Sequence, residues 1–105
     1  MSIDVIANVA RDNMTLFSNQ LFQIDRMTMM EAMTYSLPPH FSYDGYVLGP
    51  LDLRQNDYLI DTINTDPVTT RAKTYQVVNE PERFPDGHIE FMCIRADRSQ
   101  ITRGT

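Results

Sequence analysis

The clearest alternation of apolar and polar positions lies near the carboxyl end of the chain. The segment His88–Arg95 (HIEFMCIR) repeats with a period of two residues. Ile89, Phe91 and Cys93 fall on one face and Glu90 falls on the other, which is the pattern of a strand with one buried face. We therefore expect the first three side chains to lie in a core and Glu90 to face away from it.

Two earlier segments also predict strands. Asp57–Ile63 (DYLIDTI) is short and rich in Ile, Leu and Tyr, and Lys73–Glu80 (KTYQVVNE) alternates apolar and polar residues. Asn64–Ala72 joins them as a polar loop. Pro81–Gly87 (PERFPDG) combines two prolines with an Asp-Gly turn dipeptide. Residues 73–95 therefore predict an antiparallel hairpin with a long loop.

The amino half of the chain gives weaker patterns. Gln20–Thr28 (QLFQIDRMT) alternates and predicts a strand, whereas Phe41–Gly49 (FSYDGYVLG) fits a kinked strand or a tight hairpin around Asp-Gly. In residues 1–19 the apolar positions fit both a helical and a strand spacing. We expect a short helix or an irregular arm there.

The segment Met27–Phe41 predicts a long loop between early strands. Its first part, Met27–Ser36, fits either a helical turn or a loop. Pro38 and Pro39 then stop any helix or central strand. Residues 96–105 are polar and charged and predict a loose tail.

Together these segments predict a single mainly-β domain, most economically a small antiparallel β-barrel or sandwich. Its parts are the N-terminal arm or short helix in residues 1–19, a β-barrel in residues 20–95, and a tail in residues 96–105. The candidate core residues are Leu59, Tyr75, Val77, Ile89, Phe91 and Cys93.

A polar tetrad interrupts the apolar stretch Leu51–Asp61 (LDLRQNDYLID). Asn and Asp hydrogen-bond their own backbone, and Asn tolerates a left-handed conformation. The tetrad therefore predicts a turn into a strand, with Arg54, Asn56 and Asp57 as candidate turn and rim residues.

The net charge and the methionine content limit the kinds of partner that the chain can bind. The net charge of −5 argues against a surface that wraps nucleic acid, although it suits a passage through which DNA slides. Methionine is adaptable and suits surfaces that repack, but it also fills irregular cores. Both interpretations stay open for the methionine-rich segment. The candidate lumen or subunit-interface residues there are Met27, Met29, Met30, Met33, Tyr35 and Phe41.

The sequence holds little that indicates catalysis or a cofactor. His40 and His88 lack the spacing of a metal site, the glycines form no phosphate loop, and no serine has the flanking glycines of a nucleophile elbow. The single cysteine, Cys93, excludes an internal disulfide. We find no signal-peptide pattern and no run of roughly 18 to 20 apolar residues, and so expect a protein made in a cytoplasm, without a membrane partner.

The carboxyl half resembles the phage head–tail joining proteins, the stopper or head-closure proteins of long-tailed phages. The resemblance covers about residues 50–95, with the order DLRQND-Y-L-I-D, TYQVV, a turn and IEFMC. Asn56 stands where that family usually has glycine, and the loop Asn64–Ala72 is longer than the usual hairpin. The positions that match are Asp52, Leu53, Asp57, Leu59, Tyr75, Val77, Glu90 and Phe91.

The resemblance implies a structural virion protein of the neck, not an enzyme. Such a chain forms a homo-oligomeric ring, commonly dodecameric, below the portal and adaptor and above the tail terminator or tail tube. It confines packaged double-stranded DNA without reading its sequence, and assembly takes place in the host cytoplasm. Met27–Phe41 corresponds to the family's lumen-facing loop.

Other interpretations remain open. The chain also fits another phage structural protein, such as a tail terminator or capsid decoration protein. It fits a small-ligand-binding β-barrel with loops Thr28–Phe41 and Pro81–Gly87 at its mouth. A third alternative is an acid–base enzyme that uses one of the histidines with Glu31 or Glu90.

Overall fold

The computed structural model describes residues 2–38 and 40–96. Within these residues none of the helices is long and apolar enough to cross a membrane. The elements, in chain order, are β1 (Ser2–Arg11), β2 (Met14–Arg26), α1 (Met29–Thr34), β3 (Ser42–Leu48), β4 (Tyr58–Thr65), β5 (Ala72–Val77), β6 (Glu82–Arg83) and β7 (His88–Arg95).

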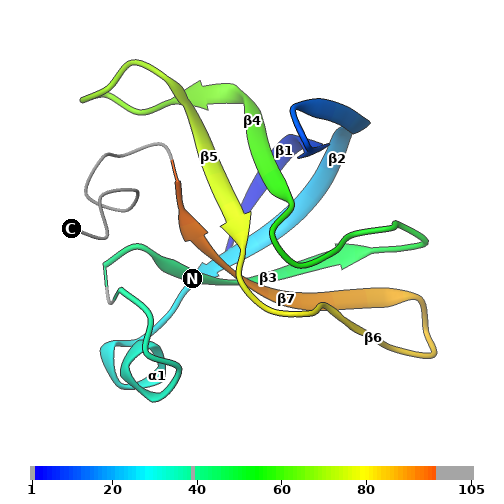
Figure 1. The fold of residues 1–105 in the computed structure, drawn as a ribbon. Coiled ribbons are helices and arrows are strands. Elements are labelled where there is room, and N and C mark those ends of the chain that lie inside the picture. The colour runs from blue at the N-terminus through cyan, green and yellow to red at the C-terminus, as the bar shows by residue number, and fades with distance from the viewer. Residues whose placement is uncertain (1, 39, 97–105) are drawn as a thin grey trace.

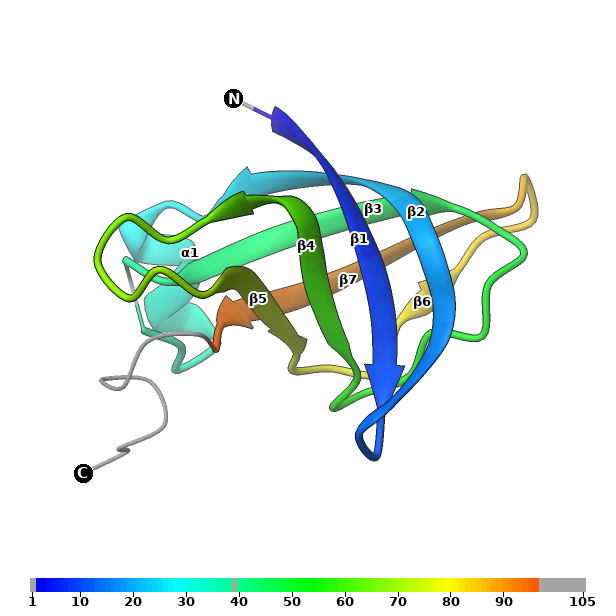
Figure 2. The ribbon, with the colours of Figure 1, turned by 90° about the horizontal axis from the view of Figure 1, so that it is seen from above.

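The strands form one antiparallel sheet that closes on itself (Figure 1). Its order is β3-β2-β1-β4-β5-β7, and a further ladder between β3 and β7 completes a six-stranded barrel. The two-residue β6 pairs with Ile89 and Glu90, near the beginning of β7. The predicted small antiparallel β-barrel is confirmed, and α1 lies at one end of β3 while the β6–β7 turn lies at the other (Figures 1 and 2).

The prediction of a short helix or arm in residues 1–19 is wrong, because this segment forms β1 and the first part of β2. Val5, Ala7 and Val9 alternate into the core, so the period of two prevails over the helical spacing. Asp12 and Asn13 make the turn with φ of 53° and 64°, which are the left-handed values that tight hairpin turns require.

A bulge interrupts the β1–β2 ladder. Ala7 pairs with Gln20 and Val9 with Phe17, so Ser18 and Asn19 lie opposite Asn8 alone. Asn19 has a φ of 54°, and its backbone N–H donates to the Asn8 side-chain oxygen at 2.9 Å. The extra residue increases the local twist of the first half of β2.

The segment Phe41–Gly49 contains one continuous strand, β3, and the predicted kink or tight hairpin at Asp-Gly is absent. Gly45 pairs with Phe91 across the β3–β7 ladder. A Cβ atom at Gly45 would lie 2.2 Å from the Phe91 ring, so the glycine makes room for that ring and does not turn the chain.

The strands predicted in the carboxyl half are present. β4 and β7 occupy the expected segments, and β5 ends earlier than expected, at Val77. β5 and β7 pair antiparallel as predicted, and the connecting loop contains the short β6. Of the predicted tail, residues 97–105 lie outside the described residues.

Side chains from all six barrel strands fill the interior. Phe22 and Phe91 meet edge to face with ring centroids 5.9 Å apart, and Tyr43 and Tyr75 do so at 5.4 Å. All six candidate core residues named above are buried, and Glu90 is exposed. Burial also raises the pKa of the Cys93 thiol, so this group stays protonated at neutral pH.

We expect Phe91→Ala to destabilise the protein by roughly 3 to 5 kcal/mol, because it empties space between Phe22 and Gly45. Denaturant unfolding followed by circular dichroism measures the change. Leu48→Ala is the control, since that side chain is exposed on the neighbouring strand. A loss below about 1 kcal/mol for Phe91→Ala would contradict this packing.

Candidate functional site

The methionine-rich segment contains a helix, so the prediction of a long loop over Met27–Phe41 is wrong in part. Thr28 caps α1, and its hydroxyl oxygen accepts the Glu31 backbone N–H at 3.1 Å. A Thr followed three residues later by Glu is a helix-start signature that the sequence carries. The helix stops after Thr34, and Ser36 then takes a left-handed φ of 57°.

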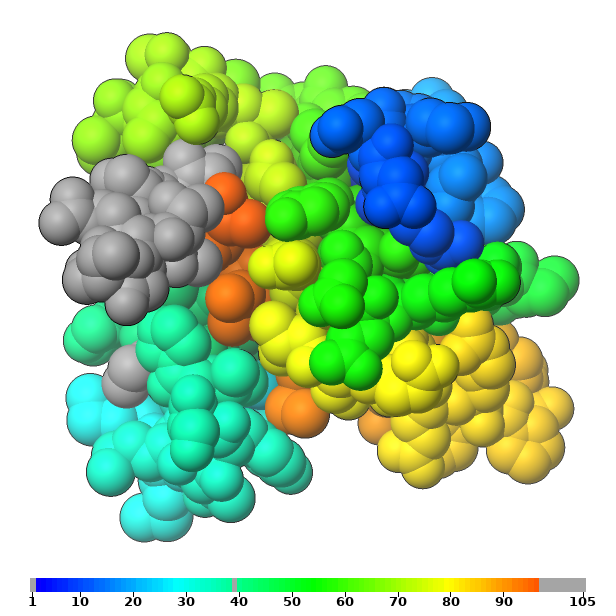
Figure 3. All heavy atoms as spheres, in the orientation of Figure 1, coloured from blue at the N-terminus to red at the C-terminus, as the bar shows by residue number. Residues whose placement is uncertain are grey.

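Helix α1 buries little of its apolar surface. Ala32 is the helix residue that packs inward. Met30 is 79% exposed, and Met29, Met33 and the following Tyr35 are exposed as well. Together with their backbone these residues form a lobe that projects from the barrel (Figure 3). We call the four exposed side chains Met29, Met30, Met33 and Tyr35 the α1 patch.

Two of the candidate interface residues differ from the other four. Met27 is 3% exposed, and its backbone N–H donates to the Ser42 carbonyl, so it belongs to the protein interior. Phe41 is half-buried, and its carbonyl oxygen accepts the Arg95 backbone N–H. These two residues anchor the ends of the segment, and the side chains of the α1 patch between them are exposed.

A second group of exposed apolar side chains crosses the outside of the barrel. Ile6 on β1 lies directly opposite Leu21 on β2, and both are exposed. The antiparallel β2–β3 ladder pairs Phe22 with Val47. Leu21 and Leu48, the adjacent residues on the two strands, line the same surface groove. We call Ile6, Leu21 and Leu48 the outer apolar row.

Four carboxylates surround a pocket of about 380 Å³ beside α1: Asp25, Glu31, Asp44 and Glu90. Asp25 and Asp44 are direct partners across the β2–β3 ladder, where like charges repel. Burial, a hydrogen bond with Glu31 and the charges of Glu31, Asp25 and Glu90 raise the pKa of Asp44 to about 7. The sequence did not indicate this cluster, because its members come from four elements.

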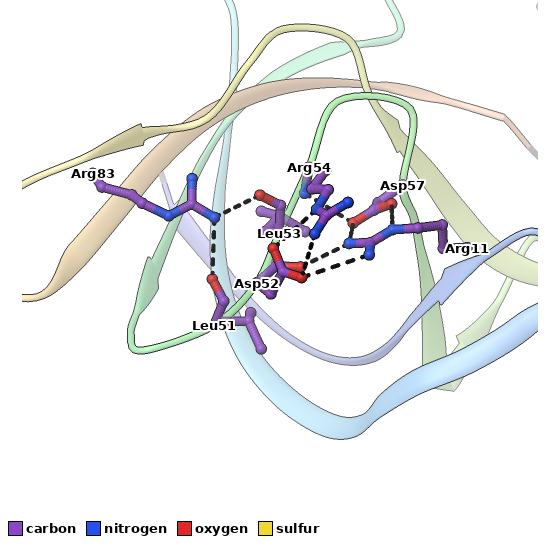
Figure 4. Close-up of polar contacts among 7 residues, drawn as sticks. All are labelled: Arg11, Leu51, Asp52, Leu53, Arg54, Asp57 and Arg83. Atoms are coloured by element: carbon purple, nitrogen blue, oxygen red, sulfur yellow. Dashed lines mark hydrogen bonds and ion pairs between the residues drawn. The ribbon is translucent and has the colours of Figure 1, made fainter.

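The tetrad in Leu51–Asp61 does form a turn, and the turn is fixed by ion pairs (Figure 4). Asn56 has a φ of 75°, as expected of a turn residue. Arg54 is exposed, and its guanidinium donates twice to the Asp52 carboxylate, both at 3.1 Å. The Arg54 contact holds the pKa of Asp52 below its usual value, with Arg11 adding to the effect.

Asp57 is not a rim residue as predicted, because its side chain is 1% exposed. The Arg11 guanidinium donates to both of its oxygens, at 2.7 and 2.8 Å, and the Arg54 backbone N–H donates at 2.9 Å. This pair joins β1 to the turn before β4. Nothing in the local sequence links Arg11 to Asp57, since they lie 46 residues apart.

A second buried ion pair fixes the β4–β5 loop. Asp66 is fully buried, and Arg95 on β7 donates to its carboxylate at 2.5 Å. The other carboxylate oxygen accepts the Val68 backbone N–H at 2.7 Å. The sequence showed only a polar loop here.

The two histidines lie apart. His40 is exposed, and its backbone carbonyl accepts a hydrogen bond from Arg26. His88 begins β7 and lies close to Asp86 and Glu90. No group of three or more metal-ligating side chains occurs among residues 2–38 and 40–96.

Comparisons of the chain with protein-family models, with curated proteins and with solved structures gave no match.

We expect Arg11→Met to cost roughly 3 to 5 kcal/mol of stability, because it leaves the buried Asp57 carboxylate without its cation. Arg54→Met is the matched control and should cost less than about 1 kcal/mol, since its ion pair with Asp52 is exposed. Chemical denaturation of both variants measures the difference. Equal losses would show that the buried pair carries no special weight.

We expect Asp44→Asn to stabilise the protein at pH 7 and above and to flatten its pH dependence. Wild-type Asp44 keeps its proton in the folded state from about pH 4 to 7, where the unfolded chain has lost it. Stability therefore falls as pH rises through this window. Unfolding free energies at several pH values test this, with the exposed turn residue Asp12→Asn as control. Parallel wild-type and Asp44→Asn profiles would contradict the assignment.

Proposed function

We propose that this chain is a non-enzymatic structural subunit of a phage neck. It is a ring-forming head–tail connector of the stopper or head-closure type, which closes the DNA channel after packaging and offers a docking surface to the tail. The observation that carries the proposal is the α1 patch. Three methionines of a six-residue helix that buries one residue, and the Tyr35 that follows the helix, are large, apolar and exposed.

Exposed methionine and tyrosine at this density favour a protein contact. Interfaces are enriched in Met and aromatic residues, and scattered single apolar residues need no such explanation. The outer apolar row lies on β1, β2 and β3, and the α1 patch lies on the connection after β2. Two different patches on one chain suit a heterologous contact, which closes into a ring when its rotation allows.

The packing of the barrel argues against the small-ligand alternative. Barrels that hold a ligand keep an empty space in their interior, as some eight-stranded barrels do. Here the six-stranded interior is occupied by its own side chains, among them Phe22, Ile24, Leu59 and Phe91. The grooves beside His88 and beside Asp44 open to the surface, and core residues such as Ile89 and Phe91 form only part of their walls.

The charge distribution suits confinement of DNA better than adhesion to it. The net charge is −5, and the carboxylates of Asp25, Glu31 and Glu90 gather beside the α1 patch around Asp44, whose pKa of about 7 leaves it partly protonated at neutral pH. A phosphate backbone approaching this surface meets like charge. In the proposed ring, DNA is held by steric closure, and the acidic side chains keep it from adhering.

We expect the purified chain to form a closed oligomer, and Met30→Asp to weaken its assembly at least about tenfold. Met30 is chosen because it is the most exposed residue of the α1 patch, so the change leaves the fold intact. Native mass spectrometry and negative-stain microscopy measure copy number and shape. Val68→Asp on the β4–β5 loop is the control, because Val68 is 73% exposed and lies outside the α1 patch.

A wild-type chain that stays monomeric at every concentration and also fails to bind a portal–adaptor complex would contradict the proposal. So would Met30→Asp assembling as well as Val68→Asp. Thermal unfolding of both variants separates a lost interface from a lost fold.

A further inference from the structure

His88 occupies a closely packed position between the β6–β7 turn and β3. Its ring stacks on Phe84, with centroids 4.3 Å apart and planes 7° from parallel. It also stacks on Tyr46 of β3 at 5.0 Å and 23°. The side chain is 14% exposed. The imidazole thus lies between the β6–β7 turn and β3, and contacts an aromatic ring of each.

Both ring nitrogens face carboxylates. Nδ1 lies 2.5 Å from an Asp86 oxygen, and Nε2 lies 3.0 Å from a Glu90 oxygen. An ionised carboxylate only accepts hydrogen bonds, and a neutral imidazole donates from one nitrogen alone. The imidazolium satisfies both contacts together, because both of its nitrogens carry a proton.

The surrounding charges favour that state. Burial alone would lower the pKa of His88, but the hydrogen bonds and charges of Asp86 and Glu90 outweigh it and raise the pKa above its usual value. Glu90 also lines the acidic pocket that contains Asp44. Arg83 of β6 lines the same groove as His88, and its guanidinium donates to the carbonyls of Leu51 and Leu53.

The turn that carries Asp86 depends on few other contacts. The Phe84 N–H donates to the His88 carbonyl and the Gly87 N–H to the Phe84 carbonyl, both at 3.0 Å. The Gly87 carbonyl accepts the Gly49 N–H at 2.7 Å. Beneath the turn lies an open groove of about 510 Å³ whose apolar lining includes Phe17, Leu51, Phe84 and Ile89.

We propose that His88 is a pH-operated latch that, as the imidazolium, fastens the turn Phe84–Gly87 to β3 and β7 over this groove. When the imidazolium loses one ring proton, a single ring N–H remains to donate to the two carboxylates of Asp86 and Glu90. One carboxylate then faces a nitrogen lone pair and moves away, and the turn loosens. This device is independent of the proposed ring function.

An NMR titration of the two histidine rings tests the protonation state, with His40→Ala to assign the signals. The His88 midpoint is expected above about 6.5, the value of an unperturbed histidine. Asp86→Asn combined with Glu90→Gln is expected to lower the midpoint, because it removes both anions. A His88 midpoint at or below 6.5 overturns the proposal.

Amide hydrogen exchange tests the latch itself. As pH rises through the His88 midpoint, Phe84 and Gly87 are expected to lose protection relative to Asn56, whose N–H bonds the Val77 carbonyl elsewhere in the barrel. The stability advantage of wild type over His88→Gln should be full near about pH 5, where both carboxylates are ionised and His88 is charged, and should disappear as pH rises through that midpoint. Protection that stays constant at Phe84 and Gly87 through the transition overturns the latch, even where His88→Gln unfolds.

Discussion

The β3–β7 ladder closes the barrel, and this closure depends on a glycine, Gly45, at the centre of β3. Phe91 lies over Gly45, and a Cβ atom there would meet its ring at 2.2 Å. The ring then reaches Phe22 across the interior. Any larger residue at Gly45 would displace this aromatic pair, so barrel closure and core packing are decided at the same place.

Two buried ion pairs determine where the loops run. Arg11 with Asp57 fixes the turn before β4, and Arg95 with Asp66 fixes the turn after it. Such pairs add little net stability over well-packed apolar residues, but removal of one partner leaves a buried charge without compensation. Both pairs connect distant parts of the chain, so the turn before β4 is tied to β1 and the loop after β4 is tied to β7.

Period-two alternation predicted β7, β5 and the second half of β2, because each has one buried face, whereas richness in Ile, Leu and Tyr predicted β4. It failed where two periods fit equally, as in residues 1–19, where only the left-handed turn at Asp12-Asn13 decides in favour of a hairpin. It also failed at Gly45, where packing against Phe91 overrides a local turn signal. Neither the acidic pocket nor the Asp57 ion pair could be predicted, because both depend on cross-strand register.

The bulge at Asn19 has a consequence for aggregation. The β2–β3 ladder pairs residues from Phe22 onward, so the first half of β2 pairs with β1 alone and offers backbone groups to a foreign strand. Asn19, with its left-handed φ, twists this edge and breaks the regular spacing that a flat template needs. Copies of the chain can therefore meet through side chains while edge-to-edge β-pairing, the route to amorphous or fibrillar assembly, is disfavoured.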